Sequence, residues 1–137
     1  MSHRRVRAGR EAGAAAIEMA LVLPILLVLV FGIVDFGRAY NAKVSLTQAA
    51  REGARVRSLG GDAAATTTRV QQAAGFLPAA DVSVGAGAAC PANPLPTDVV
   101  TVTATYTFQF VTPIGALAGL AAGPITLTGT GVMRCLG

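Results

Sequence analysis

Residues 14–34 read AAAIEMALVLPILLVLVFGIV, and this stretch decides how the rest of the chain can fold. It contains twenty-one residues, and a helix of that length spans about 30 Å, the thickness of the hydrocarbon layer of a membrane. The sequence therefore predicts one transmembrane helix over 14–34. Pro24 lies inside this helix and should kink or loosen it locally, because proline cannot donate a hydrogen bond to the carbonyl of Ala20.

Glu18 is the only ionisable residue in this stretch. A carboxylate in the hydrocarbon layer costs roughly 2.5 to 3.5 kcal/mol on insertion scales, and more if it has no partner. Some interaction must offset that cost, so Glu18 is a candidate functional residue. Gly13 stands five residues before Glu18 and is followed by Ala14. A glycine at this distance from a glutamate, after a basic leader and before an apolar helix, resembles a type IV prepilin cleavage site between Gly13 and Ala14.

The two flanks of the apolar stretch differ in charge. Arg4, Arg5, Arg7 and Arg10 precede it, whereas the flank after Val34 opens with Asp35 and has fewer positive charges. Because the more basic flank stays in the cytoplasm, the N-terminus should lie inside and the rest of the chain outside the cytoplasmic membrane.

A cleaved secretory signal peptide is the alternative interpretation of the same stretch. It would need a cleavage site of small residues after the apolar core, and residues 35–40, DFGRAY, offer no good Ala-x-Ala pattern. We therefore expect the 14–34 helix to remain in the mature protein as a single-pass anchor.

Composition fits an embedded segment joined to a small exported domain. Of the 137 residues, 53% are hydrophobic and only 13% are charged, which is unusual for a cytosolic protein. The formal net charge is +4, but the side chains that follow Gly13 contribute only +1 of it. A processed product would thus lack the basic surface that nucleic-acid binding requires, and we expect no nucleic-acid partner.

The helix should continue beyond the membrane over 35–60. This region has no proline and places Phe36, Tyr40, Val44 and Thr47 at helical spacing, which predicts an apolar stripe available to a globular domain or to neighbouring subunits. Gly60 and Gly61 are a plausible stop signal.

A second, shorter helix is expected from Asp62 to about Gly75. The Asp62 side chain can cap its first turn, and Pro78 prevents its continuation.

After Pro78 the pattern changes from helical to alternating, which predicts three strands. The first is short and contains Val82 and Val84. In the second and third, apolar or small residues alternate with threonines: Val100, Val102, Ala104, Tyr106, Phe108 and Phe110, then Ile125, Leu127, Gly129, Gly131 and Met133. The Ala-, Leu- and Gly-rich segment 114–122 between them is expected to be a packed loop or a short helix.

The predicted fold class is therefore α+β: a long N-terminal helix, transmembrane in its first half and amphipathic in its second, packed on a small antiparallel sheet of about three strands. The expected organisation is a basic cytoplasmic leader over 1–13 that is removed, a transmembrane helix over 14–34, a helical extension over 35–60 and a small exported domain over 61–137.

Cys90 lies in a Pro- and Gly-rich loop and Cys135 near the end of the last predicted strand, both on the exported side of the helix. A disulfide between them is the favoured interpretation, with free thiols as the alternative. Closing a loop of about 45 residues would contribute roughly 4 kcal/mol in the chain-entropy account.

Nothing in the sequence favours an enzyme. The only histidine, His3, lies in the leader, so Ser-His and Cys-His nucleophiles are excluded downstream of it and a metal site is poorly supported. No paired acidic residues suggest acid-base catalysis. We expect no catalytic residue, metal or cofactor; a membrane-attached enzyme or small-ligand carrier would need a pocket of converging polar groups that the sequence does not indicate.

Three ordered motifs across about forty residues resemble the TadE-like family. They are residues 13–18 with the following ALVLP at 20–24, DFGRAY at 35–40 and AAREGAR at 49–55. Met19 departs from the pattern, because such sequences usually have Phe or Tyr after the glutamate. The remainder of the chain is similar only in its Thr-rich pair of strands.

The resemblance implies a minor pseudopilin of the Tad/Flp tight-adherence pilus machinery or of a type II secretion-related apparatus. Its implied partners are a prepilin peptidase that cleaves after Gly13, other Tad pilins and pseudopilins, the inner-membrane assembly platform and the membrane itself. The new amine at Ala14 could pair with Glu18 of an adjacent subunit inside the apolar layer. The protein would function in the membrane or be incorporated in a pilus. The alternative is an uncleaved single-pass protein whose exported domain is a binding module.

Overall fold

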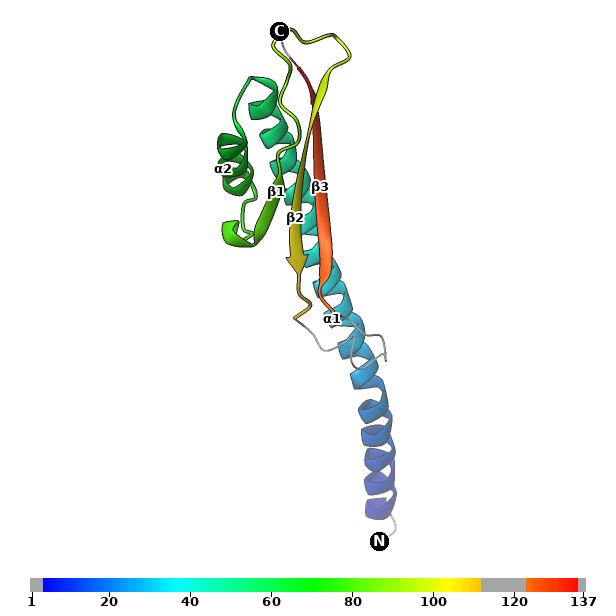
Figure 1. The fold of residues 1–137 in the computed structure, drawn as a ribbon. Helices are drawn as coiled ribbons and strands as arrows, with labels where there is room; N and C mark the ends of the chain where they lie inside the picture. The colour runs from blue at the N-terminus through cyan, green and yellow to red at the C-terminus, as the bar shows by residue number, and fades with distance from the viewer. Residues whose placement is uncertain (1–3, 112–122, 136–137) are drawn as a thin grey trace.

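The computed structural model describes residues 4–111 and 123–135, with side chains from residue 13 onward. Its elements are α1 (Arg4–Ser58), α2 (Ala63–Ala73), a short 3-10 helix η1 (Ala79–Asp81), β1 (Val82–Gly85), β2 (Val99–Phe108) and β3 (Ile125–Arg134). The predicted α+β class, a long N-terminal helix on a small antiparallel sheet, is confirmed (Figure 1).

Helix α1 has 55 residues and is therefore about 80 Å long. It continues through Pro24 without a break. Its first half projects away from the rest of the molecule and its second half lies along the sheet (Figure 1). The predicted stop is confirmed: Gly60 takes a positive φ of 85°, which glycine adopts without strain, and Gly61 N donates to Val56 O at 3.0 Å.

The sheet has the order β1-β2-β3, with both pairs antiparallel. Ala104 at the centre of β2 lies opposite Val84 on β1 and Gly129 on β3. The predicted alternation is confirmed in β2, where Val100, Val102, Ala104 and Phe108 are buried. The strand ends at Phe108, so Phe110 lies beyond it and is exposed. Threonines cover the opposite face of β2 and β3, a placement that suits their preference for pleated, half-exposed surfaces.

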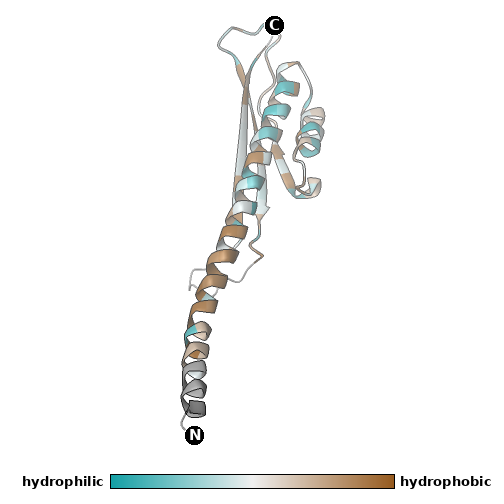
Figure 2. Ribbon diagram, turned by 180° about the vertical axis from the view of Figure 1, so that it is seen from behind, coloured by the Kyte–Doolittle hydropathy of each residue, from teal (hydrophilic) through white to brown (hydrophobic). Residues whose placement is uncertain are grey.

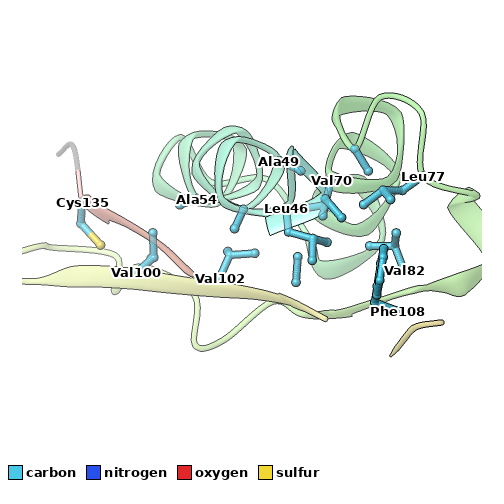
Figure 3. Packing of buried hydrophobic residues seen from close by; sticks show 14 residues of the cluster. Leu46, Ala49, Ala54, Val70, Leu77, Val82, Val100, Val102, Phe108 and Cys135 are labelled. Atoms are coloured by element: carbon cyan, nitrogen blue, oxygen red, sulfur yellow. The ribbon is translucent and has the colours of Figure 1, made fainter. Parts of the chain in front are cut away.

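The core lies between one face of the sheet and the two helices (Figure 3). Leu46 from α1, Val70 from α2 and Val100 and Val102 from β2 are its largest fully buried apolar side chains. Helix α2 begins as predicted, with the Asp62 carboxylate accepting from Ala65 N at 2.7 Å. The expected loop or helix over 114–122 lies outside the described residues.

The apolar stripe predicted for the second half of α1 is wrong as a core-facing surface. Phe36 and Tyr40 are 73% and 65% exposed, and Val44 is also exposed. The face that packs on the sheet and α2 is instead made mostly of small residues: Ala42, Leu46, Ala49, Ala50, Gly53 and Ala54. Their spacing is equally helical, so periodicity alone could not choose between the two faces.

Two glycines of β3 explain why the packed face of α1 consists mostly of small residues. A Cβ added to Gly129 would lie 2.4 Å from the Leu46 carbonyl carbon, and one added to Gly131 would lie 2.3 Å from Ala50 O. The backbones of α1 and β3 are therefore too close for any side chain between them, and a bulky residue on this face of α1 would push the layers apart. Lys43 also reaches the sheet and donates to Thr128 O.

Candidate functional site

The first half of α1 is the most unusual surface of the molecule. Every described side chain from residue 13 to residue 31 is exposed, including twelve large apolar ones from Ile17 to Phe31. Figure 2 shows this half as a nearly continuous hydrophobic column below the mixed upper half. The helix is long and apolar enough to cross a membrane, and none of its most apolar window is buried within the molecule. Such a surface requires lipid or other helices to cover it.

Glu18 lies near the start of this column and its side chain is exposed. Ala15, Met19 and Val22 surround it and form a shallow apolar hollow. No hydrogen bond or ion pair to Glu18 is found within the described part of the chain. Any group that offsets the cost of its charge in an apolar layer must therefore come from a different molecule or from the N-terminal region.

Gly13 and Ala14 continue the same exposed helix. A Cβ added to Gly13 would meet no atom within 4 Å, and Gly13 does not have a positive φ. Neither packing nor backbone conformation thus requires glycine at this position. A requirement for glycine here would have to come from outside the folded chain, for example from the narrow site of a processing enzyme.

Asp35 marks the junction between the exposed column and the folded domain. Its side chain is buried, and it accepts from Arg38 Nη1 and from Val111 N, each at 3.3 Å. The Arg38 guanidinium in turn lies 5.4 Å from the centre of the Phe108 ring, within the range of a cation–π interaction. Asp35 therefore fastens the segment after β2 to α1 at the level where the apolar column ends.

From the sequence, Asp35 was interpreted as the first residue of the outer flank and as part of the DFGRAY motif, and no tertiary contact was predicted for it. The spacing of Asp35 and Arg38 is typical of an i,i+3 helical ion pair, and this was the one available signal. The contact with Val111 joins residues 76 positions apart, and no local pattern indicates it.

Cys90 and Cys135 form the disulfide that the sequence favoured. It joins the connection between β1 and β2 to the end of β3, at the end of the domain opposite to the exposed column (Figure 1). The described residues include no group of three or more His, Cys, Asp or Glu side chains that could hold a metal ion.

The comparisons with known proteins agree with the motifs on α1. Residues 13–55 match the model of the family described as TadE-like protein. The match begins at the predicted cleavage site, covers the whole exposed column and ends in the part of α1 that packs on the sheet. No curated protein and no solved structure matches the chain.

Proposed function

We propose that this protein is a minor pseudopilin of a Tad/Flp-type pilus or a type II secretion-related apparatus, because residues 13–55 match the TadE-like family model. A prepilin peptidase cleaves it after Gly13. The mature protein then assembles through its N-terminal helix and supports pilus biogenesis, adherence or secretion.

The observation that carries this proposal is the exposed column of α1, together with its one carboxylate. A membrane anchor that served only to hold the domain would need no charge, and Glu18 costs insertion energy. The Glu18 carboxylate can stabilise an assembly if a positive charge lies at the same depth in the membrane. Cleavage after Gly13 creates one, the α-amine of Ala14, only four residues before Glu18.

Intermolecular pairing of these two groups suits the geometry better than pairing within one chain. In a straight helix the rise from Ala14 to Glu18 is about 6 Å, and the Glu18 side chain projects outward into its own exposed hollow. A neighbouring helix packed against that hollow, shifted by about one turn, would bring its terminal amine to the carboxylate. The pairing would favour ordered helix–helix contacts over a dispersed state in lipid.

The proposed topology places the leader in the cytoplasm and the domain that follows Asp35 outside. The peptidase and the inner-membrane assembly platform then meet the N-terminal end of α1. Other pilins and pseudopilins meet the exposed column. The exported side also suits the Cys90–Cys135 disulfide, because disulfides persist in oxidising compartments.

Substitution of Glu18 tests the assembly role. Glu18→Ala and Glu18→Gln should both leave the protein in the membrane fraction and correctly processed, because removing a charge favours insertion. Pilus output of the host, measured by shearing and immunoblotting, should fall several-fold, since the amine of Ala14 would lose its partner. Glu52→Gln is the matched control, because Glu52 is on the same helix but pairs with Arg69 at 3.0 Å on the surface of the domain.

Unchanged pilus output in both Glu18 variants would reject the pairing. Normal output together with an intact, uncleaved N-terminus would favour the alternative function, a single-pass membrane protein whose exported domain binds a partner.

A further inference from the structure

The end of the folded domain nearest to the exposed column carries its own apolar surface. Val111 is 73% exposed and Phe110 is 37% exposed, and both directly follow β2. On α1, Phe36 and Tyr40 are exposed at a similar height. We call these four residues the basal belt.

The height of the basal belt along α1 is fixed by contacts. Val111 N donates to Asp35, the first residue after the apolar stretch 14–34. Phe36 is the next residue, and Tyr40 lies about 6 Å beyond Phe36 along the helix axis. Phe110 is held by an edge-to-face contact with Phe108, with ring centres 5.5 Å apart. Phe36 and Val111 therefore lie at the level where the hydrocarbon layer would end, and Tyr40 lies about one turn beyond that level.

Polar groups lie next to the belt. An open hollow of about 620 Å³ shares Phe110 and Val111 with it and is also lined by Arg38, Asp81, Tyr106 and Gln109. The Arg38 side chain is 48% exposed while its guanidinium remains paired with Asp35. Aromatic residues beside an arginine with a long apolar stem are the usual composition of a protein at a membrane interface.

Other large apolar residues of the domain are exposed too, and one of them, Ile125, pairs with Phe108 at the basal end of the sheet. Leu59 and Leu95 lie near the opposite end, and Val132 lies on the threonine face of β3. Isolated exposed apolar side chains are normal on protein surfaces. The basal belt differs because it is continuous with the apolar column of α1.

We propose that the basal belt is seated in the lipid interface of the outer leaflet, so that the exported domain rests on the membrane at a fixed height and is not held above it by a free helix. This inference rests on the proposed function, because it requires α1 to span the membrane. The occupant of the surface is the lipid interface: Phe110 and Val111 enter the boundary of the acyl chains, and Arg38 with the polar hollow lies among the headgroups.

Tryptophan fluorescence tests this seating without interference, because the chain contains no tryptophan. Single substitutions are made in the full-length chain and reconstituted in lipid nanodiscs, where both membrane faces are open to a soluble quencher. Val111→Trp reports on the basal belt. Ile25→Trp, on a side chain 69% exposed near the middle of the column, reports on the anchor. Leu59→Trp, 64% exposed and about 35 Å from Asp35 along α1, is the water-exposed control.

The expected result is that lipids brominated close to the headgroup quench Val111→Trp several-fold more than Leu59→Trp, and that acrylamide quenches Val111→Trp several-fold less. Ile25→Trp should respond most to bromine deep in the acyl chains. Phe110→Trp replaces Val111→Trp if circular dichroism shows that the latter does not fold.

Each other pattern overturns the proposal in a distinguishable way. If Val111→Trp behaves like Leu59→Trp while Ile25→Trp is quenched by lipid, the anchor stands and the seating is wrong. If Val111→Trp is protected from acrylamide but not quenched by brominated lipid, another protein segment covers the belt. If brominated lipid does not quench Ile25→Trp, the membrane anchor itself fails and the proposed function falls with it.

Discussion

At the residue scale, Gly129 and Gly131 set the distance between α1 and the sheet. Both are buried on the core face of β3, and neither has a positive φ. Their role is thus close backbone approach, not an unusual conformation. Alternation in the sequence placed them on the face opposite the threonines, which is correct, but it gave no reason for glycine at these two positions. The structure shows that glycine is needed at both positions because the backbone of α1 occupies the space that a side chain would fill.

Gly131→Ala should destabilise the exported domain by about 1 to 3 kcal/mol, the usual cost of overpacking. Its new methyl group would lie 2.3 Å from Ala50 O, and backbone atoms cannot move aside as a flexible side chain can. Gly85→Ala is the matched control, because it is also a strand glycine and its nearest neighbour would be at 3.8 Å. Chemical unfolding of the full chain in detergent micelles, followed by circular dichroism, measures both. Equal stability of the two variants would show that the layers are not in close contact.

Asp35 represents the opposite case at the same scale, because its importance depends on contacts that are distant in the sequence. Arg38 is one turn away and could be anticipated, whereas Val111 could not. Tertiary contacts of this kind are specified by the packing of the whole domain. The spacing of residues along the sequence does not predict such contacts.

At the element scale, most boundaries followed from simple chemistry. Gly60 and Gly61 ended α1, the Asp62 carboxylate began α2, and alternation with threonine predicted β2 and β3. The face of α1 that packs on the domain was not predicted correctly. Large residues were expected in the core because burial of apolar area is favourable, but the close approach of β3 left room only for alanine, glycine and Leu46 on that face.

The two faces of α1 should therefore respond differently to truncation. Leu46→Ala should cost about 2 to 5 kcal/mol, because Leu46 is fully buried and its loss would leave a cavity. Gln48→Ala should change the unfolding free energy by less than about 0.5 kcal/mol, because Gln48 is exposed on α1. Urea unfolding in detergent micelles compares the two variants. A large loss for Gln48→Ala, or none for Leu46→Ala, would mean that the helix presents the other face to the domain.

At the scale of the whole molecule, the chain has two ends with different roles. The end near Cys135 is closed by a disulfide and carries β strands, whereas the end near Gly13 is a bare apolar helix (Figures 1 and 2). A domain fixed to one half of a helix leaves the other half free for lipid or for neighbouring helices. This division of α1 into a packed half and an exposed half is what the pseudopilin proposal requires.

The relative positions of the candidate site residues on α1 follow from the sequence for a physical reason. Gly13, Ala14 and Glu18 lie in one short helical segment, so their spacing along the sequence is also their spacing in space. The basal belt and the Asp35 contact join α1 to the end of β2 and could be recognised only in the structure.

The most direct test of the central claim is the N-terminal residue and intact mass of the membrane-bound protein, expressed with and without its cognate prepilin peptidase. Wild type and Gly37→Leu should begin at Ala14 only when the peptidase is present, whereas Gly13→Leu should stay uncleaved. The two glycines are matched, because both lie in α1 and an added Cβ would meet no atom within 4 Å at either. A terminus at Met1 or Ser2 in the wild type, with the peptidase as well as without it, would contradict the account.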